Sequence, residues 1–149
     1  MEAELPIASN GKRIWSFAID DMVINLFLII IFSSQLSELM AGMTEVNEAS
    51  VMLVNQFIME NIAIVFAVKV LYHTVLIWQS GMTLGKYLLK IKTVDIGSGN
   101  TPGFIQAFWR ASVRLLSEMF FYLGFLFAFF SPLHQTLHDK LSNCVVIDV

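Results

Sequence analysis

The feature that most constrains the fold is an apolar stretch at residues 14–34 that carries two adjacent carboxylates, Asp20 and Asp21. About 20 residues of helix, at about 1.5 Å each, cross the hydrocarbon core of a bilayer. Ionisable side chains at that depth cost about 2.5 to 3.5 kcal/mol each, so they face a protein interior or water and have a partner. We therefore expect a transmembrane helix at 14–34 whose polar side packs against other helices.

Arg13 stands at the entrance of this helix, seven residues before Asp20. Two helical turns separate them, so the two side chains share a face and lie roughly 10 Å apart along the helix axis. Asp21 points about 100° away from Asp20. The pattern leaves two interpretations open: a structural ion pair that fixes helix packing, or a functional carboxylate.

The composition agrees with lipid as the solvent. The 149 residues are 56% hydrophobic and 14% charged, whereas soluble domains have roughly 45 to 50% apolar and about 25% charged residues. One domain fits this length. The single cysteine, Cys144, excludes an internal disulfide and a cysteine-based zinc site. The sequence shows no motif for a nucleotide, a metal or a covalent intermediate, so we expect no cofactor, no bound metal and no enzymatic activity.

A second transmembrane helix is expected at residues 51–79, with Lys69 and His73 inside it. Counted from the cytoplasmic end of each helix, Lys69 lies about 13 Å deep and Asp20 about 10 Å deep. We therefore expect Asp20 or Asp21 to pair with Lys69. His73, one turn away on the same face, is expected near the entrance of the first helix. A carboxylate with a charged partner stays ionised near neutral pH, whereas one without a partner in an apolar medium takes up a proton and can carry it.

The distribution of cations predicts the orientation. Residues 33–50 contain three glutamates and no lysine or arginine, whereas Lys12 and Arg13 precede the first helix. Five cations follow the second helix and form an expected basic cytoplasmic face: Lys86, Lys90, Lys92, Arg110 and Arg114. By the positive-inside rule, the N-terminus lies in the cytoplasm and the acidic loop lies outside.

Two strands are expected after the second helix. The cytoplasmic segment 81–103 contains an alternating stretch at 89–96 followed by turn residues. The tail at 134–149 ends in β-branched residues, which favour a strand. Unpaired strand edges are unfavourable, so the two strands should pair, which requires a cytoplasmic C-terminus.

Residues 104–118 predict an amphipathic helix that lies in the membrane interface or enters it obliquely. Arg114 and Glu118 form an i,i+4 pair within it. The apolar segment 119–133 reaches only about 22 Å as a helix, so it either re-enters the membrane or belongs to a third span. The expected fold is an all-α multi-pass membrane protein with a small cytoplasmic strand pair.

Four motifs resemble those of the RDD family, small bacterial membrane proteins named for one arginine and two aspartates. They are RIWSFAIDDM with Arg13 and Asp20, TLGKYLLKIKTVD from Thr83, FWRASVR with Arg110, and LHDKLSNCVV with Asp139. By this resemblance Arg13, Asp20 and Asp139 are the naming residues. The resemblance also implies a multi-helix fold in the bacterial inner membrane and suggests transport, since ion or proton exchange has been proposed for some relatives.

Two functions from different classes remain open. The first is a small transporter of protons or monovalent cations with Asp20 as the titrating site. Because two or three spans enclose little space, a homo-oligomer or a membrane protein partner would complete its pathway. The second is a membrane scaffold or accessory subunit whose cytoplasmic face docks a partner or anionic lipid. The lipid bilayer is expected as a partner in both cases, and nucleic acid is not. In both, the charge network comprises Arg13, Asp20, Asp21, Lys69, His73 and Asp139.

Overall fold

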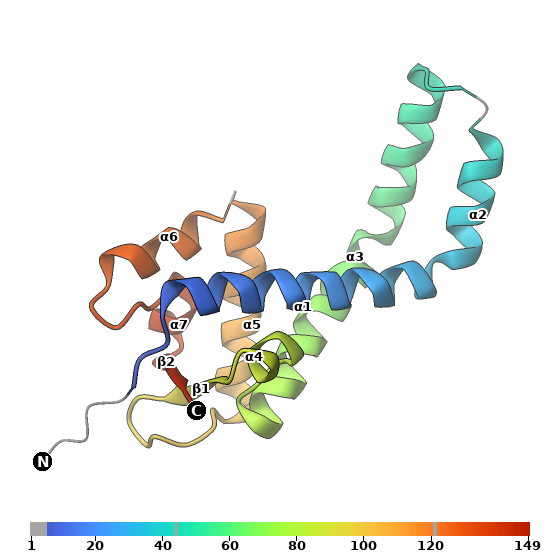
Figure 1. Cartoon of the computed structure of the whole chain (residues 1–149). Coiled ribbons are helices and arrows are strands. Elements are labelled where there is room, and N and C mark those ends of the chain that lie inside the picture. The colour runs from blue at the N-terminus through green and yellow to red at the C-terminus, as the bar shows by residue number, and fades with distance from the viewer. Residues whose placement is uncertain (1–5, 44, 121) are drawn as a thin grey trace, which may run out of the picture.

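The computed structural model describes residues 6–43, 45–120 and 122–149 (Figure 1). Residues 1–5, residue 44 of the acidic segment and residue 121 of the 119–133 segment lie outside the described part. The elements in chain order are α1 (Asn10–Ile31), α2 (Ser33–Gly42), α3 (Glu48–Ser80), α4 (Leu84–Leu88), β1 (Ile91–Asp95), α5 (Phe104–Met119), α6 (Leu123–Phe130), α7 (Leu137–Leu141) and β2 (Cys144–Asp148). The expected, mostly helical fold with two long apolar helices and a two-stranded sheet is confirmed.

Among the described residues, α1 and α3 are each long and apolar enough to cross a membrane. α1 starts four residues earlier than expected because the Ser9 side chain caps it by accepting from the Lys12 amide. α3 begins with a capping box formed by Asn47 and Ser50 and ends at Gly81, which adopts a left-handed conformation (φ 74°). Its 33 residues extend about 50 Å, which exceeds the thickness of one bilayer core.

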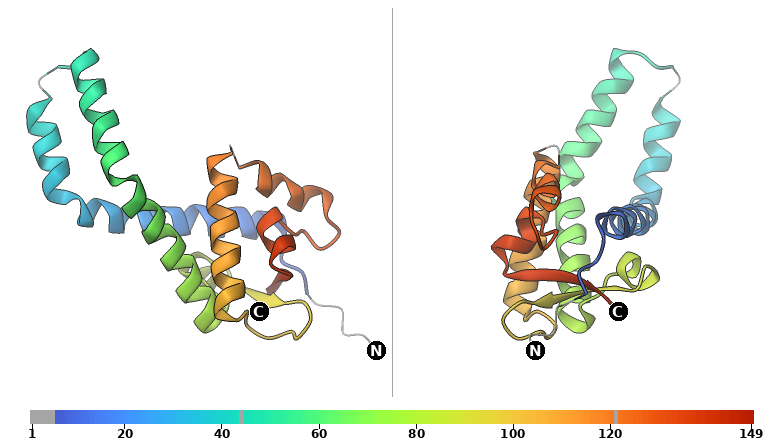
Figure 2. Two further views of the ribbon diagram at one scale, coloured as in Figure 1. Left: turned by 180° about the vertical axis from the view of Figure 1, so that it is seen from behind. Right: turned by 60° about the vertical axis from the view of Figure 1, so that its left-hand side comes forward.

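α2 occupies much of the acidic segment after α1, where the sequence predicted a loop, so that prediction was wrong for residues 33–42. Phe32 separates α1 from α2, and its ring packs edge-on against Phe57 of α3 with the ring centroids 5.8 Å apart. α2 lies beside the first half of α3 (Figures 1 and 2). The two helices form a hairpin that projects from the rest of the molecule, while the second half of α3 lies beside α5 (Figures 1 and 2).

β1 and β2 pair antiparallel, with Ile91 opposite Asp148, so the expected strand pair is confirmed. The segment before α1 joins this sheet, because the Ala8 amide donates to the Val146 carbonyl at 3.0 Å. Ala8, Ile91 and Val146 form a small buried apolar cluster. The start of α1 and the C-terminus therefore lie at the same end of the molecule (Figure 1).

α5 matches the expected helix at 104–118 to within one residue, but its polar face is turned inward. Arg110, Arg114 and Ser117 are buried, whereas Ile105 is 81% exposed and the neighbouring aromatic side chains are about half exposed. A helix lying in the membrane interface would present its polar face to water. In α5 the apolar face is the outer one, as expected of a helix surrounded by lipid.

The expected basic cytoplasmic face is wrong for three of its five residues. Lys86, Arg110 and Arg114 are buried, while Lys90 is exposed and Lys92 is partly exposed. Buried charges persist where they have charged or hydrogen-bonding partners. The three buried cations therefore belong to the interior of the protein.

α5 and α6 differ in direction by 107° and pass the length and apolarity requirements for a crossing only when taken together. α6 covers residues 123–130 of the apolar segment 119–133. The segment therefore follows a sharp change of direction and does not continue α5 as one straight helix.

Candidate functional site

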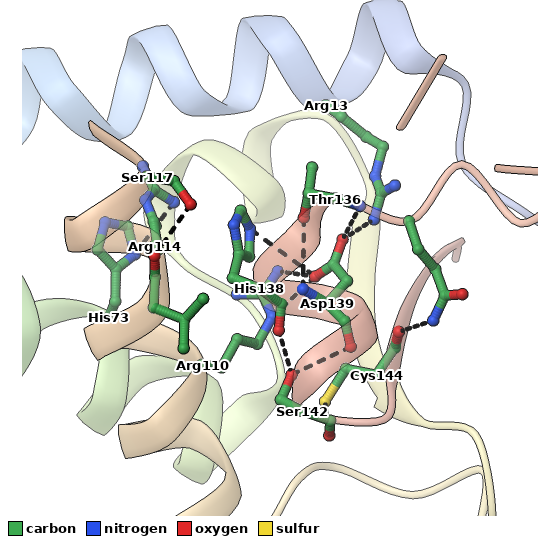
Figure 3. A network of polar contacts seen from close by, with 12 residues as sticks. Arg13, His73, Arg110, Arg114, Ser117, Thr136, His138, Asp139, Ser142 and Cys144 are labelled. Atoms are coloured by element: carbon green, nitrogen blue, oxygen red, sulfur yellow. Dashed lines mark hydrogen bonds and ion pairs between the residues drawn. The ribbon is translucent and has the colours of Figure 1, made fainter. Parts of the chain in front are cut away.

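Polar side chains meet where α1, α3, α4, α5 and α7 approach one another (Figure 3). The buried residues of α1 are Ser16, Asp20 and Ile24, which are spaced one turn apart. Arg13 lies on the same face, as the spacing predicted. α1 therefore presents one polar stripe to the other helices.

Asp139 on α7 is held by two arginines. Arg13 donates from Nη2 to Oδ2 at 2.6 Å, and Arg110 donates to Oδ1 from Nε at 2.9 Å and from Nη2 at 2.5 Å. The Thr136 amide also donates to Oδ2 at 3.3 Å and completes the capping box of α7. Burial alone would raise the pKa of Asp139, but Arg110 and Arg13 hold it well below its usual range. An ionised Asp139 thus joins α1, α5 and α7 at one point.

Asp20 is fully buried and accepts three hydrogen bonds. Tyr72 Oη and the Gly85 amide each donate to Oδ1 at 2.8 Å, and Thr83 Oγ1 donates to Oδ2 at 2.5 Å. These donors satisfy both carboxylate oxygens, and among the described residues no arginine or lysine forms an ion pair with Asp20. Asp20 therefore joins α1 to α3 and to the start of α4.

Gly85 permits this approach of α4 to α1. A Cβ at this position would overlap the backbone carbonyl oxygen of Ser16 and lie 3.0 Å from Asp20 Cγ. Thr83 caps α4 through its side chain, which accepts from the Lys86 amide. The same hydroxyl group thus caps the start of α4 and donates to Asp20.

Lys69 on α3 lies between two carboxylates. Its Nζ atom is 2.8 Å from Glu118 Oε2 and 3.3 Å from Asp21 Oδ1. Of the two aspartates expected to pair with Lys69, the structure selects Asp21, and the alternative with Asp20 was wrong. The expected Arg114 and Glu118 pair is confirmed at 3.2 Å. This second cluster joins α1, α3 and α5.

His73 is buried on the same helix as Lys69, with Nδ1 3.5 Å from Arg114 Nη1. Arg114 is also placed over the ring of Phe17, 4.9 Å from its centroid. We expected His73 near the entrance of α1. It approaches that part of α1 only indirectly, because the Arg114 side chain that it contacts lies over Phe17, which follows the first turn of α1. No hydrogen bond joins His73 to Arg13 among the described residues.

Two further ionisable groups outside the long helices are buried beside these clusters. Burial and the neighbouring Arg110 lower the pKa of Lys86 to about 7. Its Nζ atom donates to Ser16 Oγ at 3.4 Å, and within the described chain no carboxylate lies within 4.0 Å of it. Burial, together with the surrounding arginines, also lowers the pKa of His138 well below its usual value despite the nearby Asp139. The imidazole is therefore neutral near pH 7.

Sequence reasoning did not find several of the residues that hold the aspartates. Tyr72, Thr83 and Gly85 bind or approach Asp20, and Glu118 shares Lys69 with Asp21. A cap signal was present, since threonine precedes a short helical stretch at this point. It predicts the start of α4 but not that α4 packs on Asp20.

Comparison with known proteins gives one family. The sequence model of the RDD family matches residues 7–143. An uncharacterized protein of Rickettsia prowazekii is 34% identical over 97 residues, which cover 62% of this chain and 53% of that protein. The proline-rich antigen homolog of Mycobacterium tuberculosis is 30% identical over 69 residues, which cover 46% of this chain and 29% of that protein. The chain thus spans about half the length of the first relative and less than a third of the second, and no solved structure matches it.

Proposed function

The chain belongs to the RDD family, and from this premise we propose that it is a multi-pass protein of the bacterial inner membrane that exchanges protons or monovalent cations. The carboxylates that carry the exchange are Asp21 and Glu118, with Lys69 between them. The family and the two long apolar helices support the membrane location. The positive-inside rule supports a cytoplasmic N-terminus and, through the strand pair, a cytoplasmic C-terminus.

The observation that carries this proposal is the exposure of Asp21. Its side chain is 33% exposed, and it lies at the middle of α1 beside Met22, which is also exposed. An ionised carboxylate facing lipid at that depth costs about 2.5 to 3.5 kcal/mol. Water or a second protein surface must therefore cover this side of α1. A homo-oligomer or a membrane protein partner supplies such a surface, and a water-filled path at that interface gives ions access to Asp21.

Asp20 does not fit the role of titrating site that the sequence suggested for it. It is enclosed on all sides and its oxygens already accept from Tyr72, Thr83 and Gly85. Protonation of Asp20 would replace an acceptor by a donor in this shell. The distance from Lys69 Nζ to Asp21 Oδ1, 3.3 Å, is longer than the hydrogen bonds to Asp20, and the Asp21 side chain is exposed on one side. An incoming cation or proton can therefore compete with the lysine there.

The test is sodium- and potassium-driven proton flux in proteoliposomes. We compare the native chain with Asp21→Asn and Lys69→Met. Asp148→Asn is the control because Asp148 lies on β2 and pairs with Lys12 in the first turn of α1, nine residues before Asp21. Flux should fall at least tenfold in Asp21→Asn and stay unchanged in Asp148→Asn. If the flux of the native chain is no higher than that of empty liposomes with both sodium and potassium, the exchange proposal is refuted.

A scaffold or accessory subunit is the second candidate function, favoured by the saturation of Asp20 and Asp139. Both are satisfied by groups from other elements and fasten α4 and α7 to the long helices. On this reading Lys90 and Lys92 remain for docking a partner. Absence of flux together with a membrane partner that co-purifies with the native chain, and is lost in a Lys90→Gln and Lys92→Gln double variant, would favour it. We propose no enzymatic activity for either candidate.

A further inference from the structure

A cavity of about 220 Å³ lies between the first turns of α1 and the helices α5, α6 and α7. Its charged lining is unbalanced. Four cationic side chains contribute to it, Arg13, Lys86, Arg110 and Arg114, against the single carboxylate of Asp139. The cavity excludes Asp21 and Lys69, so it is separate from the exchange site proposed above.

The carboxylate in the cavity is already saturated. Both oxygens of Asp139 accept from arginines, and Oδ2 also accepts from the Thr136 amide. Arg114 lines the cavity, but its Nε donates to Glu118, which is not a lining residue. The Asp139 carboxylate therefore has little capacity to accept hydrogen bonds from other donors in the cavity.

Donors remain that have no acceptor. Among the described residues, Arg13 Nη1 is a buried nitrogen without a hydrogen-bond partner. Nδ1 of His138 has no partner there either, and in the neutral imidazole it donates only in the tautomer that places the proton on it. Within the part of the chain that the structure describes, the only hydrogen-bond partner of Lys86 Nζ is the hydroxyl of Ser16 at 3.4 Å. A buried unpaired donor costs about 1 to 3 kcal/mol, and more when it is charged. Arg13 and Lys86 both line the cavity, where an oxyanion would accept from them.

The remaining lining is apolar and reaches the outer surface. Ile14, Tyr122 and Phe129 line the cavity and are about half exposed, while Phe17 and Phe125 lie deeper. The outward faces of α1 and α6 are apolar, as expected for a surface in contact with acyl chains. A ligand in this cavity therefore meets cations at its inner end and hydrocarbon at its mouth.

We propose that the cavity binds the phosphate head group of an anionic membrane phospholipid, with the phosphate against Lys86 and Arg13 and the acyl chains leaving between α1 and α6 past Ile14 and Phe129. Charge-assisted bonds from arginine and lysine to phosphate are among the strongest hydrogen bonds in proteins. Basic pockets between transmembrane helices recognise anionic head groups by the same physics. A cavity of 220 Å³ has room for about seven waters at about 30 Å³ each, which suits a head group but not a whole lipid.

The test uses native mass spectrometry of the full chain in a neutral detergent, titrated with dioleoyl phosphatidylglycerol. Dioleoyl phosphatidylcholine is the charge control and inorganic phosphate is the free-ion arm. Lys86→Met removes the cation that has no carboxylate in contact, and Lys90→Met, an exposed lysine close in sequence, is the matched control. We expect phosphatidylglycerol to bind the native chain and Lys90→Met equally, and to bind Lys86→Met at least tenfold more weakly.

A second variant keeps the proposal testable if Lys86→Met does not fold. Ala128 is buried and lines the cavity, so Ala128→Leu fills part of the space and removes no charge. It should also weaken phosphatidylglycerol binding. Equal binding of phosphatidylglycerol and phosphatidylcholine, unchanged binding in both cavity variants, or binding of inorganic phosphate without any lipid preference would each overturn the proposal. None of these outcomes depends on proton flux.

Discussion

Asp139→Asn is the most direct test of the charge network. The substitution keeps the volume of the side chain but removes the charge that neutralises Arg13 and Arg110, which lie 2.6 and 2.5 Å from it. Removing one partner of a buried ion pair costs about 3 to 5 kcal/mol, because the remaining charge is left without compensation. Here two guanidinium groups lose their partner, while the asparagine oxygen still accepts a hydrogen bond. We expect a loss of about 4 kcal/mol in the free energy of unfolding.

The chain supplies a matched control on its surface. Lys12 and Asp148 form an ion pair of similar length, 2.8 Å, but the two side chains are 43% and 39% exposed. Exposed pairs contribute about 0 to 1 kcal/mol, so Asp148→Asn should change the free energy of unfolding by less than about 1 kcal/mol. Burial is thus the main difference between the two variants.

The assay is reversible unfolding in mixed micelles of dodecylmaltoside and sodium dodecyl sulfate, followed by far-ultraviolet circular dichroism. A double-mutant cycle with Arg13→Gln adds the coupling between the two residues, which should lie at about 0.5 to 3 kcal/mol. A loss in Asp139→Asn no larger than that in Asp148→Asn would refute the reasoning. It would mean that water reaches the carboxylate or that the arginines find other acceptors.

Two further outcomes follow from the contacts of α4. Gly85→Ala should lower the free energy of unfolding by about 1 to 3 kcal/mol, because the new Cβ meets the Ser16 carbonyl oxygen and Asp20. Gly11→Ala should leave it unchanged or raise it slightly, because no described residue beyond the chain neighbours and the local helix backbone lies within 4 Å of the added Cβ. The same unfolding assay compares the two variants. The pKa of Lys86 is lowered to about 7 from 10.5 by burial among other cations, so the unfolded chain binds more protons between those values and stability should rise with pH in that window. The slope is at most about 1.4 kcal/mol per pH unit, and it should disappear in Lys86→Met; an unchanged slope in that variant would show that another group titrates.

Patterns that depend on spacing within one element were predictable from the sequence. The seven-residue spacing placed Arg13 and Asp20 on one face of α1, and the four-residue spacing gave the Arg114 and Glu118 pair. The depth comparison between the two long helices also brought Lys69 to the level of the aspartates on α1. Each of these predictions needs only the residue spacing, which the sequence gives, and the fixed rise and periodicity of an α-helix.

Contacts between elements were less predictable. Asp20 and Asp21 are one residue apart and the depth argument fitted both, so only the placement of α3 and α4 decides which of them meets Lys69. The three donors to Asp20 include a backbone amide, that of Gly85, and no side-chain pattern identifies a backbone donor. The tight approach of α4 also depends on the absence of a Cβ at Gly85. In the sequence, a glycine required for close packing looks the same as a glycine that only forms a turn.

The inverted polarity of α5 has a physical cause that a helical pattern alone does not contain. Periodicity shows that Arg110 and Arg114 share a face, but it does not show whether water or protein lies on that side. The buried acceptors decide this: Asp139 on α7 binds Arg110, and Glu118 on α5 itself binds both Arg114 and Lys69. These carboxylates are shielded from the outer surface. The cationic side chains that pair with them therefore also lie in the interior, and the apolar face of α5 lies outside. The same interior charges that anchor the helices thereby create the cationic cavity at the start of α1, so the architecture and the proposed lipid site have one origin.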